Sequence, residues 1–192
     1  MAEESETVLA DRVRKGDMAA FEMLCKRIEA PLFHYALGLI RNPQEAEDVA
    51  QETLLRLYRM ARSGRLDAGR NSCRSLAFTV VHNLSMDAHR RARHRIPPCA
   101  PSPSGPSPSE STERALLREQ IDLALARIPD THRSALLLRE FGGLTYSEIA
   151  EALTVSSNVV KIWIYRARRK LAGLLDREGQ YVPDADDSLQ GG

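Results

Sequence analysis

The chain is poor in the residues on which several classes of protein depend. Of its 192 residues, three are cysteine and one is tryptophan, and aromatic side chains make up 5%. Cys25, Cys73 and Cys99 are widely separated and form no CxxC pair, which argues against a zinc site and against a disulfide scaffold. The low aromatic content and the lack of sustained strand-like alternation favour an all-α fold made of small helical domains.

Other absences narrow the range of functions. No apolar run approaches the ~18 residues that a transmembrane helix needs, and no signal peptide is recognisable, so we predict a soluble cytoplasmic protein without membrane insertion. The sequence contains no glycine-rich phosphate loop, no GxSxG and no HExxH. We therefore expect neither an enzyme nor a protein that depends on a metal, a cofactor or a small-molecule substrate.

Charge is nearly balanced overall but unevenly placed. The formal net charge is +1, while acidic residues collect near both ends and basic residues collect at Arg90–Arg95 and Lys161–Lys170. Both basic clusters end apolar helical patterns, which favours a nucleic-acid partner. The plainer alternative is a pair of solvated helix faces.

Residues 96–112 divide the chain into two parts. This segment contains six prolines and five serines, a composition that cannot build a packed core and that predicts a flexible linker. It separates a front domain, residues 1–95, from a back domain, residues 113–176. An acidic tail, residues 177–192, is predicted to be disordered.

Helix-start signals follow one another in the front domain. Asp17 is a predicted N-cap, Pro31 is predicted to begin a second helix, and Asn42 followed by Pro43 begins a third. A fourth helix is expected to run from about Cys73 into the arginine cluster.

The polar faces of the third and fourth helices are candidate contact surfaces. Asp48, Gln51 and Glu52 fall at i, i+3 and i+4 and form one acidic patch, either an ordinary solvated face or a dock for a basic partner helix. On the fourth helix, side chains that can hydrogen-bond bases and phosphates are expected along the exposed side, which suits melted DNA. They are His82, Asn83, Asp87, Arg90 and Arg91.

The most specific local pattern is TYSEIAEALTVSSNVVKIWIYRARRKL, residues 145–171. Thr145-x-x-Glu148 predicts a capping box that begins a short helix, and a turn is expected at Thr154. A second helix follows and becomes strongly basic. A helix-turn-helix presents the front of its second helix to the DNA major groove, with basic residues on the flanking phosphates.

Three stretches, taken together, resemble the extracytoplasmic-function sigma factors of bacterial RNA polymerase. Residues 42–59 resemble the family's polymerase-binding helix, residues 74–93 its promoter-melting helix, and residues 128–171 its reader of the minus-thirty-five element. The three occur in the family's order, with the linker before the third. The resemblance implies a region-2-like front domain, which binds core polymerase and melts the minus-ten element, and a region-4-like back domain.

The resemblance also implies roles for individual residues. Those implied to bind core polymerase, at the clamp helices of its largest subunit, are Asp48, Gln51, Glu52 and Arg56. Those implied to contact promoter DNA from the front domain are Arg74, His82, Asn83, Arg90 and Arg91. Those implied to contact it from the back domain are Ser157, Asn158, Lys161, Ile162, Trp163, Tyr165, Arg166 and Arg169. Further implied partners are the flap of the second polymerase subunit and an anti-sigma factor.

Departures from the family pattern bear on these sites. Leu76 stands where the family usually has tryptophan. Thr154 stands at the turn where the family usually has glycine, although a β-branched residue disfavours positive φ. Ile162 and Trp163 replace residues that are usually polar; they could contact thymine methyl groups, bind a protein instead or mark a weakly functional copy.

Two other functions stay open on sequence grounds. A helix-turn-helix regulator would bind DNA without polymerase, although the acidic patch and the lack of a sensor domain count against it. A sigma-like decoy would keep the fold, lose its DNA contacts and sequester an anti-sigma protein, for which Ile162 and Trp163 leave room.

Overall fold

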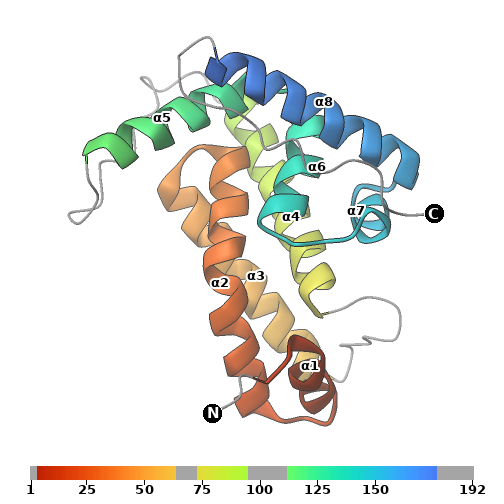
Figure 1. Cartoon of the computed structure of the whole chain (residues 1–192). Coiled ribbons are helices and arrows are strands. Elements are labelled where there is room, and N and C mark those ends of the chain that lie inside the picture. The colour runs from red at the N-terminus through yellow and green to blue at the C-terminus, as the bar shows by residue number, and fades with distance from the viewer. Residues whose placement is uncertain (1–3, 64–72, 95–111, 177–192) are drawn as a thin grey trace.

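The computed structural model describes residues 4–63, 73–94 and 112–176, and within these ranges it contains helices and no strands (Figure 1). The front lobe consists of α1 (Glu6–Arg14), α2 (Met18–Ile40), α3 (Pro43–Arg62) and α4 (Cys73–His94). The back lobe consists of α5 (Thr112–Ala126), α6 (Asp130–Glu140), α7 (Tyr146–Leu153) and α8 (Ser157–Asp176). The predicted all-α fold is confirmed. The predicted linker, apart from Thr112, and the predicted tail lie outside the described residues.

Side-chain caps begin the long helices of the front lobe where the sequence predicts them. The Asp17 carboxylate accepts a hydrogen bond from the backbone N–H of Ala20 at 3.1 Å, and the Asn42 side chain accepts one from that of Glu45 at 3.2 Å. Each cap satisfies a donor that the first helical turn leaves without a partner. These caps fix where α2 and α3 begin.

The predicted helix boundary at Pro31 is wrong. α2 is a single helix of 23 residues with Pro31 inside it, although a proline there lacks an N–H and crowds the carbonyl four residues earlier. The buried stripe of α2 continues across the proline, with Ile28 before it and Leu32 and Tyr35 after it. Burial of one continuous face therefore outweighs the local cost of proline.

α1 was not predicted, because the sequence analysis identified its first helix only at Asp17. Its side chains Leu9 and Val13 are buried, and the helix packs against α2. With only 9 residues, it shows too few turns for its apolar pattern to stand out in the sequence.

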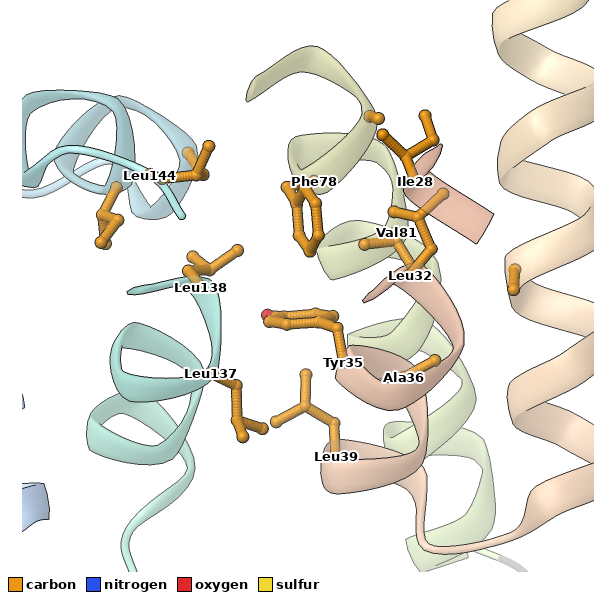
Figure 2. Close-up of a cluster of buried hydrophobic side chains, with 14 of the residues drawn as sticks. Ile28, Leu32, Tyr35, Ala36, Leu39, Phe78, Val81, Leu137, Leu138 and Leu144 are labelled. Atoms are coloured by element: carbon orange, nitrogen blue, oxygen red, sulfur yellow. The ribbon is translucent and has the colours of Figure 1, made fainter. Parts of the chain in front are cut away.

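The two lobes are in direct contact. α2 packs against α6, and α4 packs against α7. Figure 2 shows Leu137, Leu138 and Leu144 of the back lobe facing Tyr35 of α2 and Phe78 of α4. All five side chains are at most 3% exposed, so one hydrophobic core continues from lobe to lobe. The sequence analysis did not predict this contact.

Candidate functional site

The outer face of α3 carries the predicted acidic patch. Asp48 and Gln51 are exposed and Glu52 is half-buried, while the opposite face buries Val49, Thr53 and Leu57 among others. The hydroxyl of Thr53 donates to the carbonyl of Val49 at 2.8 Å, so this polar residue is satisfied inside the core. The patch therefore lies on a helix whose opposite face is packed in the hydrophobic core.

Arg56, the fourth residue implied to bind core polymerase, is exposed beside the patch. Its Nε donates to Glu52 Oε1 at 2.8 Å. The hydrogen bond from Arg56 lowers the pKa of the Glu52 carboxyl, which keeps that side chain ionised. Leu55, which the sequence analysis missed, is 50% exposed and follows Gln51 and Glu52 at i+4 and i+3, so an apolar side chain joins the acidic patch.

A cleft between α3 and α4 brings two predicted sites together. It has a volume of about 800 Å³ and is lined by Asp48 on one side and by Arg90 and Arg91 on the other. Arg90 donates a hydrogen bond to Asp87, one turn earlier on α4. Asp48 was predicted for polymerase and the two arginines for DNA, so the two predicted contact surfaces adjoin at this end of the front lobe.

Asn83 is exposed on α4 as predicted, but His82 is not. The prediction that His82 lies along the exposed side is wrong, because the hydroxyl of the fully buried Tyr35 forms a hydrogen bond with His82 Nδ1 at 2.7 Å. Burial lowers the pKa of His82 to about 4, so the imidazole is neutral near pH 7.

The side chain of Arg74 is also engaged in hydrogen bonds within the protein. Its Nε donates to the Gly142 carbonyl at 2.5 Å, and its Nη2 donates to the Phe141 carbonyl at 3.2 Å. Its Nη1 donates to Glu6 Oε1 at 2.8 Å. A residue predicted to contact DNA thus ties α4 to the end of α6 and to α1.

The helix-turn-helix forms as the sequence predicts. In the capping box, Thr145 Oγ1 accepts from the Glu148 N–H at 3.3 Å, and Glu148 Oε2 accepts from the Thr145 N–H at 2.8 Å. Thr154 ends α7 in the left-handed region with φ 56°. The Val155 N–H then bonds the Ala150 carbonyl at 2.9 Å, which closes the turn.

Most of the residues of α8 that were predicted to contact DNA lie on its exposed face, opposite the face that is buried. Its buried face consists of Val160, Ile164, Ala167 and Leu175. The exposed group is Asn158, Lys161, Ile162, Tyr165, Arg166 and Arg169, and Ser157 at the start of the helix is half-buried.

Trp163 belongs to the other side of α8. Its ring is half-buried, packs on the core and lies 6.0 Å from the ring of His132 on α6. It follows the buried Val160 by three residues, so it faces α6 rather than the surface that carries Ile162 and Tyr165. The structure therefore assigns Trp163 mainly to lobe packing.

Tyr146 contacts two basic side chains, an arrangement that the sequence analysis did not predict. Lys161 Nζ lies 5.9 Å from the centre of its ring, and the Arg139 guanidinium lies 5.3 Å from it. Two cations against one aromatic ring hold α6, α7 and the front of α8 together. A tyrosine at the first position of α7 gives no periodic signal by which this role could have been recognised.

Three further features of the described residues concern metal sites, membrane-spanning helices and the reactivity of cysteines. Among them there is no group of three or more His, Cys, Asp or Glu side chains that could hold a metal ion. No helix in the described ranges is long and apolar enough to cross a membrane. Cys73 is buried, and burial raises the pKa of the half-buried Cys25 thiol to about 11, so Cys25 stays protonated.

Known protein families match both lobes. The Sigma-70 region 2 family matches residues 24–95, and the Sigma-70 region 4 family matches residues 118–171. The chain is 31% identical to the ECF RNA polymerase sigma factor SigM of Mycobacterium tuberculosis over 160 residues, which are 83% of this chain and 79% of SigM. The chain belongs to the extracytoplasmic-function sigma factors.

Other relatives agree with this assignment. The sigma factor is 29% identical to the RNA polymerase sigma-H factor of Pseudomonas aeruginosa, over 89% of this chain and 94% of that protein. Among solved structures, it is similar to CnrH in complex with the cytosolic domain of CnrY, with TM-score 0.69, 23% identity and coverage of 92% and 100% of the two chains. It is also similar to the sigma factor RpoE in complex with the anti-sigma factor NepR from Bartonella quintana, with TM-score 0.66, 22% identity and coverage of 81% and 96%.

Proposed function

We propose that the front lobe of this sigma factor docks on core RNA polymerase through the acidic patch of α3 and holds the melted minus-ten strand with α4. The carboxylates of the exposed Asp48 and the half-buried Glu52, together with the exposed Leu55, suit a basic partner helix such as the clamp helices of the largest polymerase subunit. Asn83, Arg90 and Arg91 are the exposed α4 residues that suit DNA. The adjoining position of the two surfaces, across the α3–α4 cleft, is the observation that carries the proposal.

The back lobe is proposed to read the minus-thirty-five element through α8. Asn158 can bond base edges and Ile162 can touch a thymine methyl group, while Lys161, Arg166 and Arg169 are placed for phosphates. The flap of the second polymerase subunit is the proposed partner for the rest of this lobe. The protein would act in the bacterial cytoplasm, without catalysing a reaction of its own.

Control by an anti-sigma factor is part of the same proposal. One of the structural relatives was solved with the anti-sigma factor NepR, and the fold is shared over most of the chain. A partner that covers the α3 patch or the front of α8 would block the proposed contacts.

The polymerase dock can be tested by reversing its charge. Changing both Asp48→Lys and Glu52→Lys should abolish pull-down by core polymerase, because like charges would face the basic partner helix. The fold should survive, since Asp48 is exposed and Glu52 lies off the buried stripe. Glu22→Lys with Glu29→Lys, two exposed changes on α2, is the charge-matched control and should bind normally. Unimpaired binding by the Asp48 and Glu52 variant would rule out this dock.

A further inference from the structure

We propose that the outer face of α3 binds the same face of a second copy of this protein, as an antiparallel helix pair centred on Leu55. The order of charges along this face identifies the occupant, because that order becomes its own complement when the helix is reversed. The face overlaps the proposed polymerase dock, but self-association does not depend on that role. A second copy on α3 would keep the polymerase away, so the two partners would compete for one surface.

The outer face of α3 carries one row of side chains, which we call the α3 stripe. Its members follow one another at three- or four-residue steps, so they stay within about 60° of Leu55 around the helix axis. α2 and α4 pack against α3, and the opposite face of α3 is buried. The stripe itself is exposed, apart from the half-buried Glu52. It consists of Asp48, Gln51, Glu52, Leu55, Arg59 and Arg62.

Charge changes sign along the α3 stripe, and Leu55 lies at its midpoint. Asp48 and Arg62, at the two ends, are each seven residues from Leu55. Glu52 lies about one turn before Leu55 and Arg59 about one turn after it, on the same side of the stripe. The proposed polymerase dock includes neither Arg59 nor Arg62, so that role does not account for the basic half of the stripe.

A two-fold axis through Leu55 brings opposite charges together. In an antiparallel pair about this axis, Asp48 of one copy faces Arg62 of the other, and Glu52 faces Arg59. Symmetry forms each ion pair twice, as in the isologous interface of a two-fold dimer. A parallel pair in register would instead set Asp48 against Asp48 and Arg62 against Arg62, which repulsion between like charges disfavours.

Apolar side chains lie at the centre of the proposed pair. Leu55 is 50% exposed, and Tyr58, three residues further along α3, is 39% exposed. At the axis Leu55 would meet Leu55 of the second copy, which removes apolar surface from water. Tyr58 would border this contact, and its hydroxyl already accepts a hydrogen bond from Arg62 Nη1 at 3.4 Å. An apolar centre with a charged rim is a common arrangement in protein–protein interfaces.

The size of the contact predicts a weak, reversible dimer. At a rise of about 1.5 Å per residue, the stripe from Asp48 to Arg62 is roughly 21 Å long. A single helix pair of this length buries less than the roughly 1,200 Å² of a stable interface. The dimer should therefore dissociate on dilution and also at high salt, because salt screens exposed ion pairs.

Sedimentation equilibrium of the full chain, from micromolar to millimolar concentration, tests the dimer. The wild type should show a monomer–dimer equilibrium. Leu55→Lys puts two like charges at the axis and should raise the dissociation constant of the dimer by about 10-fold or more. Leu116→Lys on α5 is the matched control, because Leu116 is 56% exposed and lies off the stripe, and its dissociation constant should equal that of the wild type. A wild type that stays monomeric, or a dimer that Leu55→Lys leaves intact, would overturn the proposal.

An exchange of charges tests the register of the pair. Asp48→Lys with Glu52→Lys makes the stripe basic throughout, and Arg59→Glu with Arg62→Glu makes it acidic throughout. Each double variant alone should be monomeric, with helical content unchanged by circular dichroism. An equimolar mixture of the two should associate at least as strongly as the wild type, because every facing pair is then again opposite in sign. A mixture that stays monomeric would show that these residues do not face one another.

Arg59→Glu with Arg62→Glu also separates this inference from the proposed polymerase dock. Neither arginine belongs to that dock, so the variant should lose self-association and should still be pulled down by core polymerase. This combination of results supports the proposal. A variant that remains dimeric overturns the proposal, whatever the result of the pull-down.

Discussion

Ile162 and Trp163 are neighbours in the chain but have different surroundings. Ile162 is 48% exposed, whereas Trp163 packs on the core beside His132. Trp163→Ala should therefore lower the unfolding free energy by about 2–3 kcal/mol, below the range for a fully buried tryptophan, with promoter preference unchanged. Ile162→Ala should leave stability nearly unchanged and reduce discrimination between promoters by about 1 kcal/mol.

Thermal melting and competition binding to promoter variants distinguish these outcomes. If Trp163→Ala altered promoter preference without lowering stability, the assignment of Trp163 to packing would be wrong. If Ile162→Ala changed neither quantity, the departure of this residue from the family pattern would have no role in DNA recognition.

His82 makes stability depend on pH in a defined direction. Burial lowers its pKa from 6.5 to about 4, so the His82 imidazole is neutral in the folded protein near pH 7. The unfolded chain takes up a proton below about pH 6.5, and the contribution is therefore complete above that pH and is lost as the pH falls toward 4. The loss amounts to about 3 kcal/mol.

Replacing His82 isolates this contribution from those of other titrating groups. His82→Gln keeps a side-chain hydrogen-bond partner for Tyr35 but cannot titrate. Urea unfolding between pH 7 and 4 should show a shallower decline in stability for this variant than for the wild type. Parallel curves would show that His82 is not the buried neutral group described here.

At the scale of elements, the turn of the helix-turn-helix contains local strain. Thr154 has φ 56°, a conformation that costs a β-branched residue about 1–2 kcal/mol. Thr154→Gly should relieve that strain and stabilise the back lobe by about 0.5–1 kcal/mol after the entropy cost of glycine. Thr131→Gly, in the first turn of α6, is the matched control and should destabilise by about 0.3–0.5 kcal/mol, the difference in helix propensity between threonine and glycine. A lower melting temperature for Thr154→Gly would contradict the observed turn geometry.

The elements themselves were largely predictable from local patterns. The Asn42 cap, the Thr145–Glu148 capping box and the outward position of Asp48 are set within a few residues, and the structure reproduces them. The continuity of α2 through Pro31 was not predictable, because burial along the whole helix decides it and local propensity argues against it.

At the scale of the whole molecule, the surroundings of Arg74 and His82 could not be inferred from the sequence. Helical periodicity places both residues on α4 but does not reveal that the back lobe binds Arg74 or that α2 of the front lobe binds His82. Arg74 bonds carbonyls 67 and 68 residues away in the chain, and Tyr35 lies 47 residues from His82. Contacts of such long range leave no periodic signal, so the sequence indicated two domains without indicating that they pack together.

Transcription reconstituted from purified components tests the central claim most directly. Core polymerase with and without this protein would be given fragmented genomic DNA of the source organism, and the 5′ ends of the transcripts would be mapped. The account predicts a small set of new start sites that require the protein, each preceded by common minus-ten and minus-thirty-five elements, and their loss with the Asp48→Lys and Glu52→Lys variant. Binding of the protein to DNA with no new start sites would instead indicate a regulator that acts without polymerase. Binding to neither DNA nor polymerase would indicate a decoy, and either result would contradict the account.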